Sequence, residues 1–505
     1  MLMHQLLLDG AERHPDKLVF RWIDRSRTLS YGAAVAQMLD LAGGLADLGI
    51  RKGDRVSIVA HNGMDYLVAM LACWRLGAIA ALVNVKFADE LDYYFSDHTP
   101  SVVIYTHDIE AAVKRGAAAA GTVRHRICMD GPQEGALALA ELMAARLPAP
   151  ADPWDDSAIA HLAYTSGTTG KPKGASLMHE PTVRAARCIG ERLRLTGTDI
   201  SFGPTALSSS YQLVANLLPP LAVGAEINVM GRWTPATGYD AIDAVGATYL
   251  VGNPTLLQET LEQSRDRGRP PGKLRFVLSG GGPVPTALKQ AWRDELSLPL
   301  VESYGQSELG GFVGLGYPEL VPDKLLGAVG PALPDKEVRV LDTAGHDTPT
   351  GVIGELCVRG GYMAGYWGRE AATANALRDG WLHTGDAGTV DAARNVTMRG
   401  RFSELLSIGG VTWYPRDVED ALCLEPEVAE AAVVALPSAS GQRAVACVRL
   451  VPGSTIDTQA MLARIAPRLP YDLSALAILP VDAFPMTPTG KIAKAELVAS
   501  LSRAP

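Results

Sequence analysis

A short apolar run over residues 159–164 leads directly into a segment rich in glycine, hydroxyl and lysine side chains. That segment, 164–174, reads Tyr-Thr-Ser-Gly-Thr-Thr-Gly-Lys-Pro-Lys-Gly. Glycines let backbone N–H groups approach an anion, hydroxyls add hydrogen-bond donors, and lysines neutralise charge. Phosphate-binding loops usually lie beyond the carboxyl end of a strand in an α/β sheet. The segment therefore predicts a polyphosphate-binding loop that follows a strand.

This loop differs from the common phosphate-binding loop. A Walker loop requires the pattern G-x-x-x-x-G-K-[ST] at the start of a helix. Here Lys171 is followed by Pro172, which removes a backbone donor and fixes φ. The pattern therefore excludes a P-loop NTPase or kinase of that type.

Strand and helix patterns alternate over most of the first 300 residues. Strand-like runs are found at 55–60, 79–85, 248–251, 274–279 and 300–303, with helical runs between them at 31–50, 64–76 and 256–262. Such alternation predicts an α/β fold with largely parallel sheets covered by helices. Between 337 and 360, short strands and Gly/Pro turns predict a small β subdomain.

The chain is too long for one hydrophobic core, since it has 505 residues. After residue 400 the pattern changes to a compact α+β unit with a helix starting at Pro415, strands at 431–436 and 444–450 and a helix at 458–468. We predict an N-terminal domain over 1–400 and a C-terminal domain over 401–505, each large enough to fold alone.

Charge and cysteine usage limit the partners and the compartment. The formal net charge of −9 argues against nucleic acid or an anionic membrane surface as the main partner. Six cysteines without C-x-x-C spacing are typical of a reducing compartment. The N-terminus lacks a signal pattern and no apolar run reaches about 18 residues, so we expect no membrane span and a cytoplasmic location.

Further motifs follow the loop in a fixed order. They are Tyr304-Gly305-Gln306-Ser307-Glu308, Gly354-Glu355-Leu356 with Gly365-Tyr366-Trp367, Trp381-Leu382-His383-Thr384-Gly385-Asp386, Gly400-Arg401 with Gly409-Gly410 and Pro415, and Pro488-Thr489-Gly490-Lys491. In this order and spacing, the chain resembles the adenylate-forming superfamily of acyl-CoA synthetases, peptide-synthetase adenylation domains and luciferases over about residues 10–495. The resemblance implies ATP, Mg²⁺ and CoA as the small molecules that the protein uses.

The resemblance also implies an ATP site. The loop would hold the departing pyrophosphate through Thr165, Ser166, Gly167, Thr168, Thr169, Gly170, Lys171 and Lys173. Tyr304 would stack on adenine, with Gly280, Gly281, Gly282 and Gly305 close to the purine or the substrate. Asp386 and Arg401 would contact the ribose, Ser307 would contact the α-phosphate, and Glu308 would act in catalysis by holding Mg²⁺, which prefers oxygen ligands. Taken singly, Asp386 could be a turn residue, Arg401 a surface arginine and Tyr304 a core residue.

Lys491 would be the catalytic lysine, on a mobile C-terminal domain. A carboxylate that attacks the α-phosphorus of ATP meets another anion, and a point cation between them stabilises the transition state. Taken alone, a lysine in this position near a C-terminus is usually solvated. By resemblance, the C-terminal domain would turn about Ser403 after adenylation and bring Gly409 and Gly410 to a tunnel for the CoA thiol.

The resemblance places an acyl pocket at Ser209, Tyr211, Asn253, Pro254, Gly280, Gly305, Gly310, Gly311 and Phe312. Ser209 stands where acyl-CoA synthetases often carry a gating histidine, and no histidine occurs in 180–345. No acidic residue is placed to bind an α-amino group, which argues against an amino-acid substrate. The many small residues predict volume for a bulky apolar acid such as a ring system.

The thiol acceptor is left open by the sequence. Residues 469–490 contain no Lys or Arg, and Asp472 stands where relatives typically have a lysine. CoA phosphates would then depend on other cations such as Arg443 or Arg468. Two alternative functions remain open: a ligase that loads a carrier protein, and a nucleotide sensor without catalysis. The oligomeric state is also open, and a homodimer is one candidate.

No histidine lies in a metalloprotease or hydrolase motif, and His161 is expected to be a packed core residue.

Overall fold

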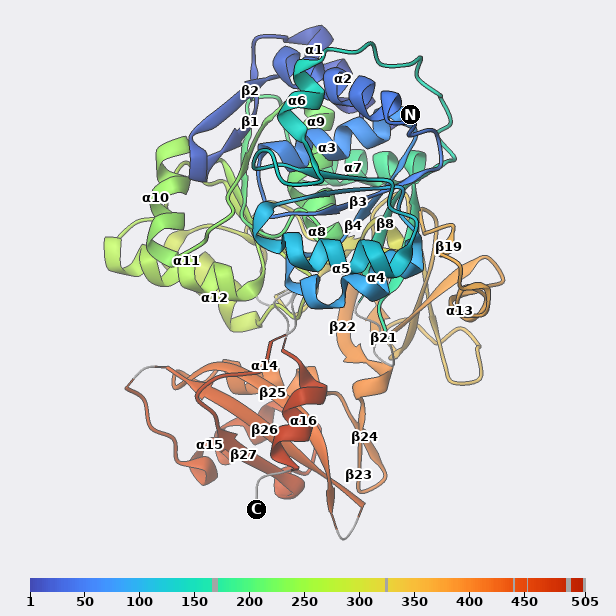
Figure 1. The fold of residues 1–505 in the computed structure, drawn as a ribbon. Coiled ribbons are helices and arrows are strands. Elements are labelled where there is room, and N and C mark those ends of the chain that lie inside the picture. The colour runs from blue at the N-terminus through green and yellow to red at the C-terminus, as the bar shows by residue number, and fades with distance from the viewer. Residues whose placement is uncertain (166–170, 323–325, 439–440, 452, 487–491, 503–505) are drawn as a thin grey trace.

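The structure is a computed structural model that describes residues 1–165, 171–322, 326–438, 441–451, 453–486 and 492–502. Figure 1 shows a large body formed by the N-terminal part of the chain and a smaller body below it formed by the C-terminal part. This confirms the predicted mixed α/β fold. None of the helices in the described ranges combines the length and apolar character needed to cross a membrane.

One large sheet contains the strand that precedes the glycine-rich loop. Its strand order is β19-β9-β8-β4-β3-β5-β6-β7, and the pairs from β8 to β7 are parallel. The bounds are β3 Arg55–Val59, β4 Ile79–Leu82, β5 Val102–Tyr105, β6 His125–Cys128, β7 Leu137–Ala138, β8 Ile159–Thr165, β9 Lys173–Met178 and β19 Gly365–Tyr366. The glycine-rich loop thus connects β8 to its antiparallel neighbour β9.

A second large sheet has the order β15-β14-β13-β12-β10-β11-β1-β2 and is parallel from β14 to β1. Its bounds are β1 Leu18–Trp22, β2 Arg27–Ser30, β10 Ile200–Gly203, β11 Glu226–Val229, β12 Tyr249–Gly252, β13 Phe276–Ser279, β14 Leu300–Gln306 and β15 Gly311–Leu315. Parallel strands that are buried on both faces read as continuous apolar runs, which is why β12, β13 and β14 could be predicted.

Helices fill the space between the large sheets and cover their outer faces. Their bounds are α1 Gln5–Arg13, α2 Tyr31–Asp47, α3 Met64–Leu76, α4 Leu91–His98, α5 Glu110–Ala120, α6 Leu139–Ala144, α7 His179–Arg192, α8 Ser210–Gln212, α9 Leu218–Val223, α10 Pro235–Val245, α11 Pro254–Arg267 and α12 Thr286–Leu296. A common core joins residues of α3, α7 and α9 to both sheets. Gly77, at φ +69°, ends α3 in the left-handed conformation that glycine adopts at little cost.

The predicted small β subdomain is a separate sheet with the order β16-β22-β21-β18-β17, to which β20 is added through β21. The bounds are β16 Gly330–Pro331, β17 Glu337–Leu341, β18 Gly354–Arg359, β20 Leu377–Arg378, β21 Trp381–Val390 and β22 Asn395–Arg401, with α13 at Glu370–Ala376. Strand β22 ends at Arg401, next to the predicted domain boundary. The division into two domains after residue 400 remains our prediction.

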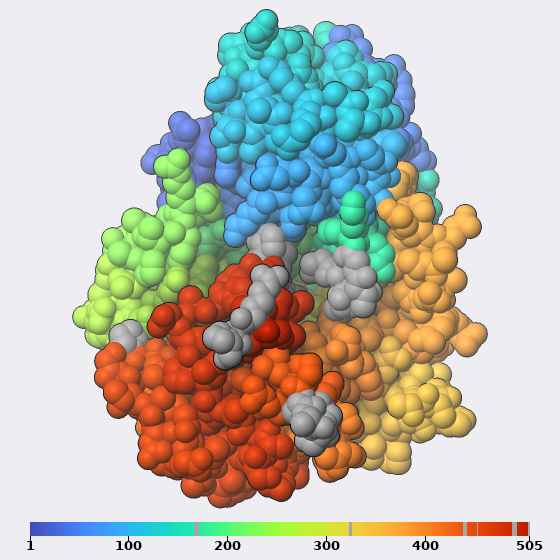
Figure 2. All heavy atoms as spheres, turned by 60° about the horizontal axis from the view of Figure 1, so that its bottom comes forward, coloured from blue at the N-terminus to red at the C-terminus, as the bar shows by residue number. Residues whose placement is uncertain are grey.

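The C-terminal unit contains a β23–β24 hairpin and a β25-β26-β27 sheet. The bounds are β23 Leu406–Ile408, β24 Val411–Trp413, α14 Pro415–Cys423, β25 Val428–Ser438, β26 Gly441–Leu450, α15 Thr458–Ile465, β27 Leu476–Pro480 and α16 Lys494–Leu501. It has its own hydrophobic cluster built from β23 to β27, α14 and α15. In Figure 2 this unit, in red, lies against the N-terminal body.

A buried group of charges joins the two units. Arg416, at the start of α14, donates from Nη2 to Glu302 Oε1 at 3.1 Å and to the carbonyl oxygen of Val284 at 3.2 Å. Lys289 on α12 pairs with the other oxygen of Glu302. All three charged side chains are at most 7% exposed. Burial alone would raise the pKa of Glu302, but Lys289 and Arg416 hold it below its usual range.

His161 on β8 is buried as predicted, and we expect it to make stability pH-dependent. Its ring nitrogens have no hydrogen-bond partner among the described residues, and burial lowers its pKa from 6.5 to about 4. As the pH falls, His161 therefore takes up a proton in the unfolded chain before it does so in the folded protein. The stability that the neutral buried ring contributes is full above pH 6.5 and is lost as the pH falls towards 4.

Replacing His161 with phenylalanine should remove this pH dependence. The decrease in the free energy of unfolding from pH 7.5 to pH 5 should be about 2 kcal/mol smaller in the variant than in the wild type. Urea unfolding at both pH values measures the difference. An identical pH dependence in both proteins would contradict this assignment.

Candidate active site

Asp386 on β21 is the centre of a buried polar network. Its carboxylate is 3% exposed and accepts hydrogen bonds at Oδ2 from Tyr304 Oη at 2.8 Å and from Gln306 Nε2 at 2.6 Å. Arg401 Nε lies 3.1 Å from Oδ1, because Arg401 is opposite Asp386 in the antiparallel β21–β22 pair. Burial and the charge of Asp386 raise the pKa of Tyr304 well above its usual value. The structure thus brings Tyr304, Asp386 and Arg401 together, as the sequence predicted.

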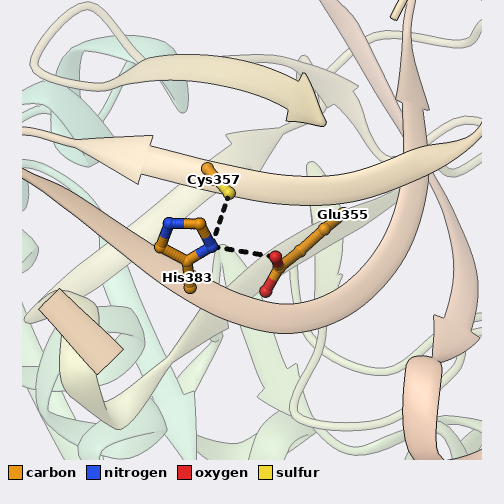
Figure 3. A group of neighbouring side chains, drawn as sticks. All are labelled: Glu355, Cys357 and His383. Carbon is orange, nitrogen blue, oxygen red and sulfur yellow. Dashed lines mark hydrogen bonds and ion pairs between the residues drawn. The ribbon is translucent and has the colours of Figure 1, made fainter. Parts of the chain in front are cut away.

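Glu355 holds the turn that carries Asp386, and it lies together with Cys357 and His383 (Figure 3). Glu355 accepts the N–H of Gly385 at 3.1 Å, and its other oxygen lies 2.9 Å from His383 Nδ1. His383 Nδ1 also lies 3.3 Å from Cys357 Sγ. These are donor types that bind zinc, and their ligand atoms lie within 4.8 Å of one another. The hydrogen bonds among them already account for the arrangement, which fixes the Thr384-Gly385-Asp386 turn.

The Ser307-Glu308 pair forms a short 3-10 turn at the end of β14, the strand that carries Tyr304. Ser307 Oγ accepts a hydrogen bond from Ser210 Oγ at 3.1 Å. Glu308 Oε1 accepts one from Tyr366 Oη at 2.7 Å. Gly281, just after β13, has φ +75°, which glycine adopts at little cost, and open space where a Cβ would lie. Gly282 is half-buried next to it.

The two ends of the glycine-rich loop are brought together by strand pairing. Thr165 is opposite Lys173 in the antiparallel β8–β9 pair. Lys171 Nζ lies 4.7 Å from the ring centre of Tyr93, and Lys173 Nζ lies 4.6 Å from that of Tyr366. The predicted ligands Ser166, Gly167, Thr168, Thr169 and Gly170 lie outside the described residues.

The predicted acyl-pocket positions are brought together only in part. Tyr211 Oη donates to the carbonyl oxygen of Leu278 at 3.1 Å, and its ring centre lies 5.9 Å from that of Phe312. Ser209 instead caps α8 by accepting the N–H of Tyr211 at 3.2 Å. Asn253 similarly caps α11, which begins at Pro254, by accepting the N–H of Leu256 at 2.8 Å. These two side chains therefore have local structural roles.

The expectation that glycines open the acyl pocket was wrong in its physical reasoning. A Cβ at Gly305 would lie 2.5 Å from the carbonyl oxygen of Gly311, and one at Gly311 would lie 2.6 Å from the Cβ of Ala185. At Gly280 the space is filled by Ser303, and at Gly310 a Cβ would lie 3.3 Å from Thr182 Oγ1. These glycines permit close packing of the protein itself, so they do not by themselves leave volume for an acid.

The predicted hinge residue Ser403 lies two residues after Arg401, and the predicted tunnel residues lie in the C-terminal unit. Ser403 is in the 3-10 turn Phe402–Glu404 that leads from β22 into the C-terminal unit. Gly409 and Gly410 form the exposed turn of the β23–β24 hairpin, which Figure 1 shows on the far side of that unit. Arg468 donates to Glu425 Oε1 at 2.8 Å, whereas Arg443 is exposed and has no ion pair within the described ranges. Lys491 lies outside the described residues.

Comparisons with known proteins identify the family of this chain. The family model "AMP-binding enzyme" matches residues 7–367, and "AMP-binding enzyme C-terminal domain" matches residues 417–491. The chain belongs to the AMP-binding enzyme family. A feruloyl-CoA synthase from an Amycolatopsis species is 32% identical over 477 residues, which are 93% of each chain. An indoleacetate–CoA ligase of Aromatoleum aromaticum is 30% identical and covers 97% of this chain and 96% of its own.

Solved structures show the same fold as this AMP-binding enzyme. ATP-bound MatB from Rhodopseudomonas palustris has a TM-score of 0.88 and 26% identity, with 100% of this chain and 99% of the other covered. An anthranilate CoA ligase in complex with anthranoyl-AMP has a TM-score of 0.91 and 24% identity, with 99% and 97% covered.

Four residues of this AMP-binding enzyme were missed from the sequence: three contact residues of the candidate site, and Arg416 joins the two units. Gln306 and Tyr366 were within the recognised motifs, but nothing in a linear pattern shows that they contact Asp386 and Glu308. Ser210 is next to Ser209, the residue that was chosen instead. Arg416 follows the predicted helix start, and its partner Glu302 is 114 residues away.

Proposed function

We propose that this chain activates an aromatic or similarly bulky, non-amino carboxylic acid with ATP and transfers the acyl group to CoA. It is an AMP-forming acyl-CoA synthetase, as expected for a member of this family with CoA-ligase relatives along its whole length. The observation that carries the site assignment is the buried Asp386 carboxylate. Tyr304, Gln306 and Arg401 surround it. The 3-10 turn that carries Ser307 and Glu308 directly follows Gln306 in the chain.

In the first half-reaction the substrate carboxylate attacks the α-phosphorus of ATP, which gives acyl-AMP and pyrophosphate. Asp386 and Arg401 would hold the ribose, Tyr304 would stack on adenine, and Ser307 would donate to the α-phosphate. Lys171, Lys173 and the loop between β8 and β9 would take up the charge of the departing pyrophosphate. Lys491 would lie between the two reacting anions.

Glu308 fits the Mg²⁺ that the family uses with ATP. Its Oε1 is occupied by Tyr366, and its Oε2 has no hydrogen bond or ion pair within the described ranges. A carboxylate oxygen is the ligand type that Mg²⁺ requires, and the bound ion would neutralise phosphate charge.

In the second half-reaction the thiol of CoA attacks the acyl carbonyl and AMP leaves. We propose that the C-terminal unit turns about Ser403 between the half-reactions, which would bring Gly409 and Gly410 to the thiol. Arg443 supports CoA as the acceptor, because it is an exposed cation without an ion pair among the described residues. A carrier protein is the alternative acceptor, and a direct comparison of the two thiols separates them.

The nature of the acid is proposed from charge and from relatives. No acidic or basic side chain is among the predicted acyl-pocket positions. The relatives named above are a feruloyl-CoA synthase and an indoleacetate–CoA ligase. A cytoplasmic location is also proposed, because all six cysteines are free thiols. A homodimer remains a prediction.

Pyrophosphate release across an acid panel tests the proposed acid class. The panel should contain aromatic acids, long and short straight-chain acids, and α-amino acids, each compared by kcat/KM. We expect the highest values for aromatic or other cyclic acids. If short straight-chain acids or amino acids surpass all of them, the proposed substrate class is wrong.

Replacing Asp386 with asparagine should weaken ATP binding, because Arg401 then loses its charged partner and the ribose loses an anionic acceptor. Hydrogen bonds to charged groups contribute about 1.5–3 kcal/mol, so we expect the KM for ATP to rise about 10- to 100-fold. Asp391→Asn is a matched control, because Asp391 caps the exposed β21–β22 turn through Ala393 and Asn395. An unchanged KM in Asp386→Asn would contradict the ribose assignment.

A further inference from the structure

The segment 362–367 contacts both the main chain and the side chain of Glu308. The backbone N–H of Met363 donates to the carbonyl oxygen of Glu308 at 2.7 Å. Tyr366 Oη donates to Glu308 Oε1 at the same distance of 2.7 Å. Both the main chain and the side chain of Glu308 are therefore held by one short segment.

Tyr366 is itself fixed by the sheet that carries the glycine-rich loop. It belongs to β19, which pairs with β9 at Ala175, and Trp367 N donates to the carbonyl oxygen of Gly174 at 2.8 Å. Its own N–H donates to Thr373 Oγ1 at 2.9 Å. With the backbone held on both sides, the hydroxyl group has a defined position next to Glu308.

The ring of Tyr366 also lies beneath Lys173, whose Nζ is 4.6 Å from the ring centre. No ion pair between Lys173 and Glu308 is found among the described residues. A direct ion pair would engage both charges with each other. The ring instead offers Lys173 a cation–π contact, which leaves its N–H donors available to phosphate oxygens.

We infer that Tyr366 is a positioning residue for the metal and phosphate groups of the active site. Its hydroxyl holds Glu308 through one oxygen so that Oε2 faces the Mg²⁺ that accompanies ATP, and its ring keeps Lys173 as a separate phosphate ligand. This inference rests on the proposed function, in which Glu308 holds Mg²⁺. A purely structural Tyr366 would support packing of the small β sheet and would not change metal affinity.

Tyr366→Phe separates these roles, because it keeps the ring and removes only the hydroxyl. Mn²⁺ is a paramagnetic substitute for Mg²⁺, and its binding to the purified protein with ATP, without acid, can be followed by electron paramagnetic resonance. We expect Mn²⁺ affinity to fall roughly tenfold or more, as the loss of a hydrogen bond to a charged group predicts. Thioester formation from supplied acyl-AMP should stay as in the wild type.

Two further variants make the result decisive. Tyr362→Phe is the matched control, because Tyr362 lies in the same segment but donates to the carbonyl oxygen of Gly380 at 3.3 Å; it should bind Mn²⁺ as the wild type does. Glu308→Gln should weaken binding more than Tyr366→Phe. If Tyr366→Phe alone retains wild-type Mn²⁺ affinity, the inference is wrong and the proposed function stands. If Glu308→Gln retains it as well, the metal role of Glu308 fails and the inference fails with it.

Discussion

Replacing Lys491 with alanine is expected to slow acyl-adenylate formation by about 10²–10³-fold, the usual effect of removing one group that stabilises developing charge. The reason is electrostatic: the carboxylate and the α-phosphate are both anions, and the proposed lysine cation lies between them. Thioester formation from supplied acyl-AMP has no such anionic encounter, so its rate should stay close to that of the wild type. Pyrophosphate release measures the first half-reaction, and mass detection of acyl-CoA measures the second.

Lys491→Arg is the control, since it keeps the positive charge and should lose less adenylation activity than alanine does. Equal losses of both half-reactions in Lys491→Ala would contradict the proposal that the C-terminal unit presents different groups in the two steps.

Replacing Arg416 with alanine is expected to destabilise the attachment of the C-terminal unit. Arg416 is the C-terminal member of the buried Lys289–Glu302–Arg416 group, and removing one partner of a buried ion pair typically costs 3–5 kcal/mol. Lys289 still compensates Glu302, so we expect about 3 kcal/mol, near the lower end of that range. Denaturant unfolding measures the loss of free energy, and proteolysis near residues 399–404 should become faster.

Arg443→Ala is the matched control, because this arginine of the same unit is exposed and has no ion pair among the described residues. Surface substitutions of this kind usually change stability by less than about 0.5 kcal/mol. If Arg416→Ala is as stable as Arg443→Ala, the buried charges do not join the two units energetically.

The elements that were predicted well have strong local signals. Helix α3 was predicted at its observed bounds, and Gly77 ends its apolar run. The start of α14 was predicted at Pro415, because proline suits the first position of a helix. Strand β8 was predicted from one apolar run that precedes the glycines. The family followed from motifs in a fixed order, which also gave Tyr304, Asp386 and Arg401.

The residues that could not be predicted depend on contacts between distant segments. Tyr366 contacts Glu308 only because β19 pairs with β9, and Arg416 contacts Glu302 only because α14 lies against α12. The reasoning that glycines leave space in the acyl pocket failed for a related reason. A glycine in a sequence shows that a Cβ is absent, but which atoms fill its place depends on the tertiary structure, as Gly305 and Gly311 show.

The most direct test of the central claim is one incubation of the purified protein with ATP, Mg²⁺, CoA and a panel of aromatic acids, with pyrophosphate and acyl-CoA both quantified. The account predicts that at least one acid gives pyrophosphate and acyl-CoA in equal amounts. Pyrophosphate and acyl-AMP without any CoA thioester, for every acid that reacts, would contradict it.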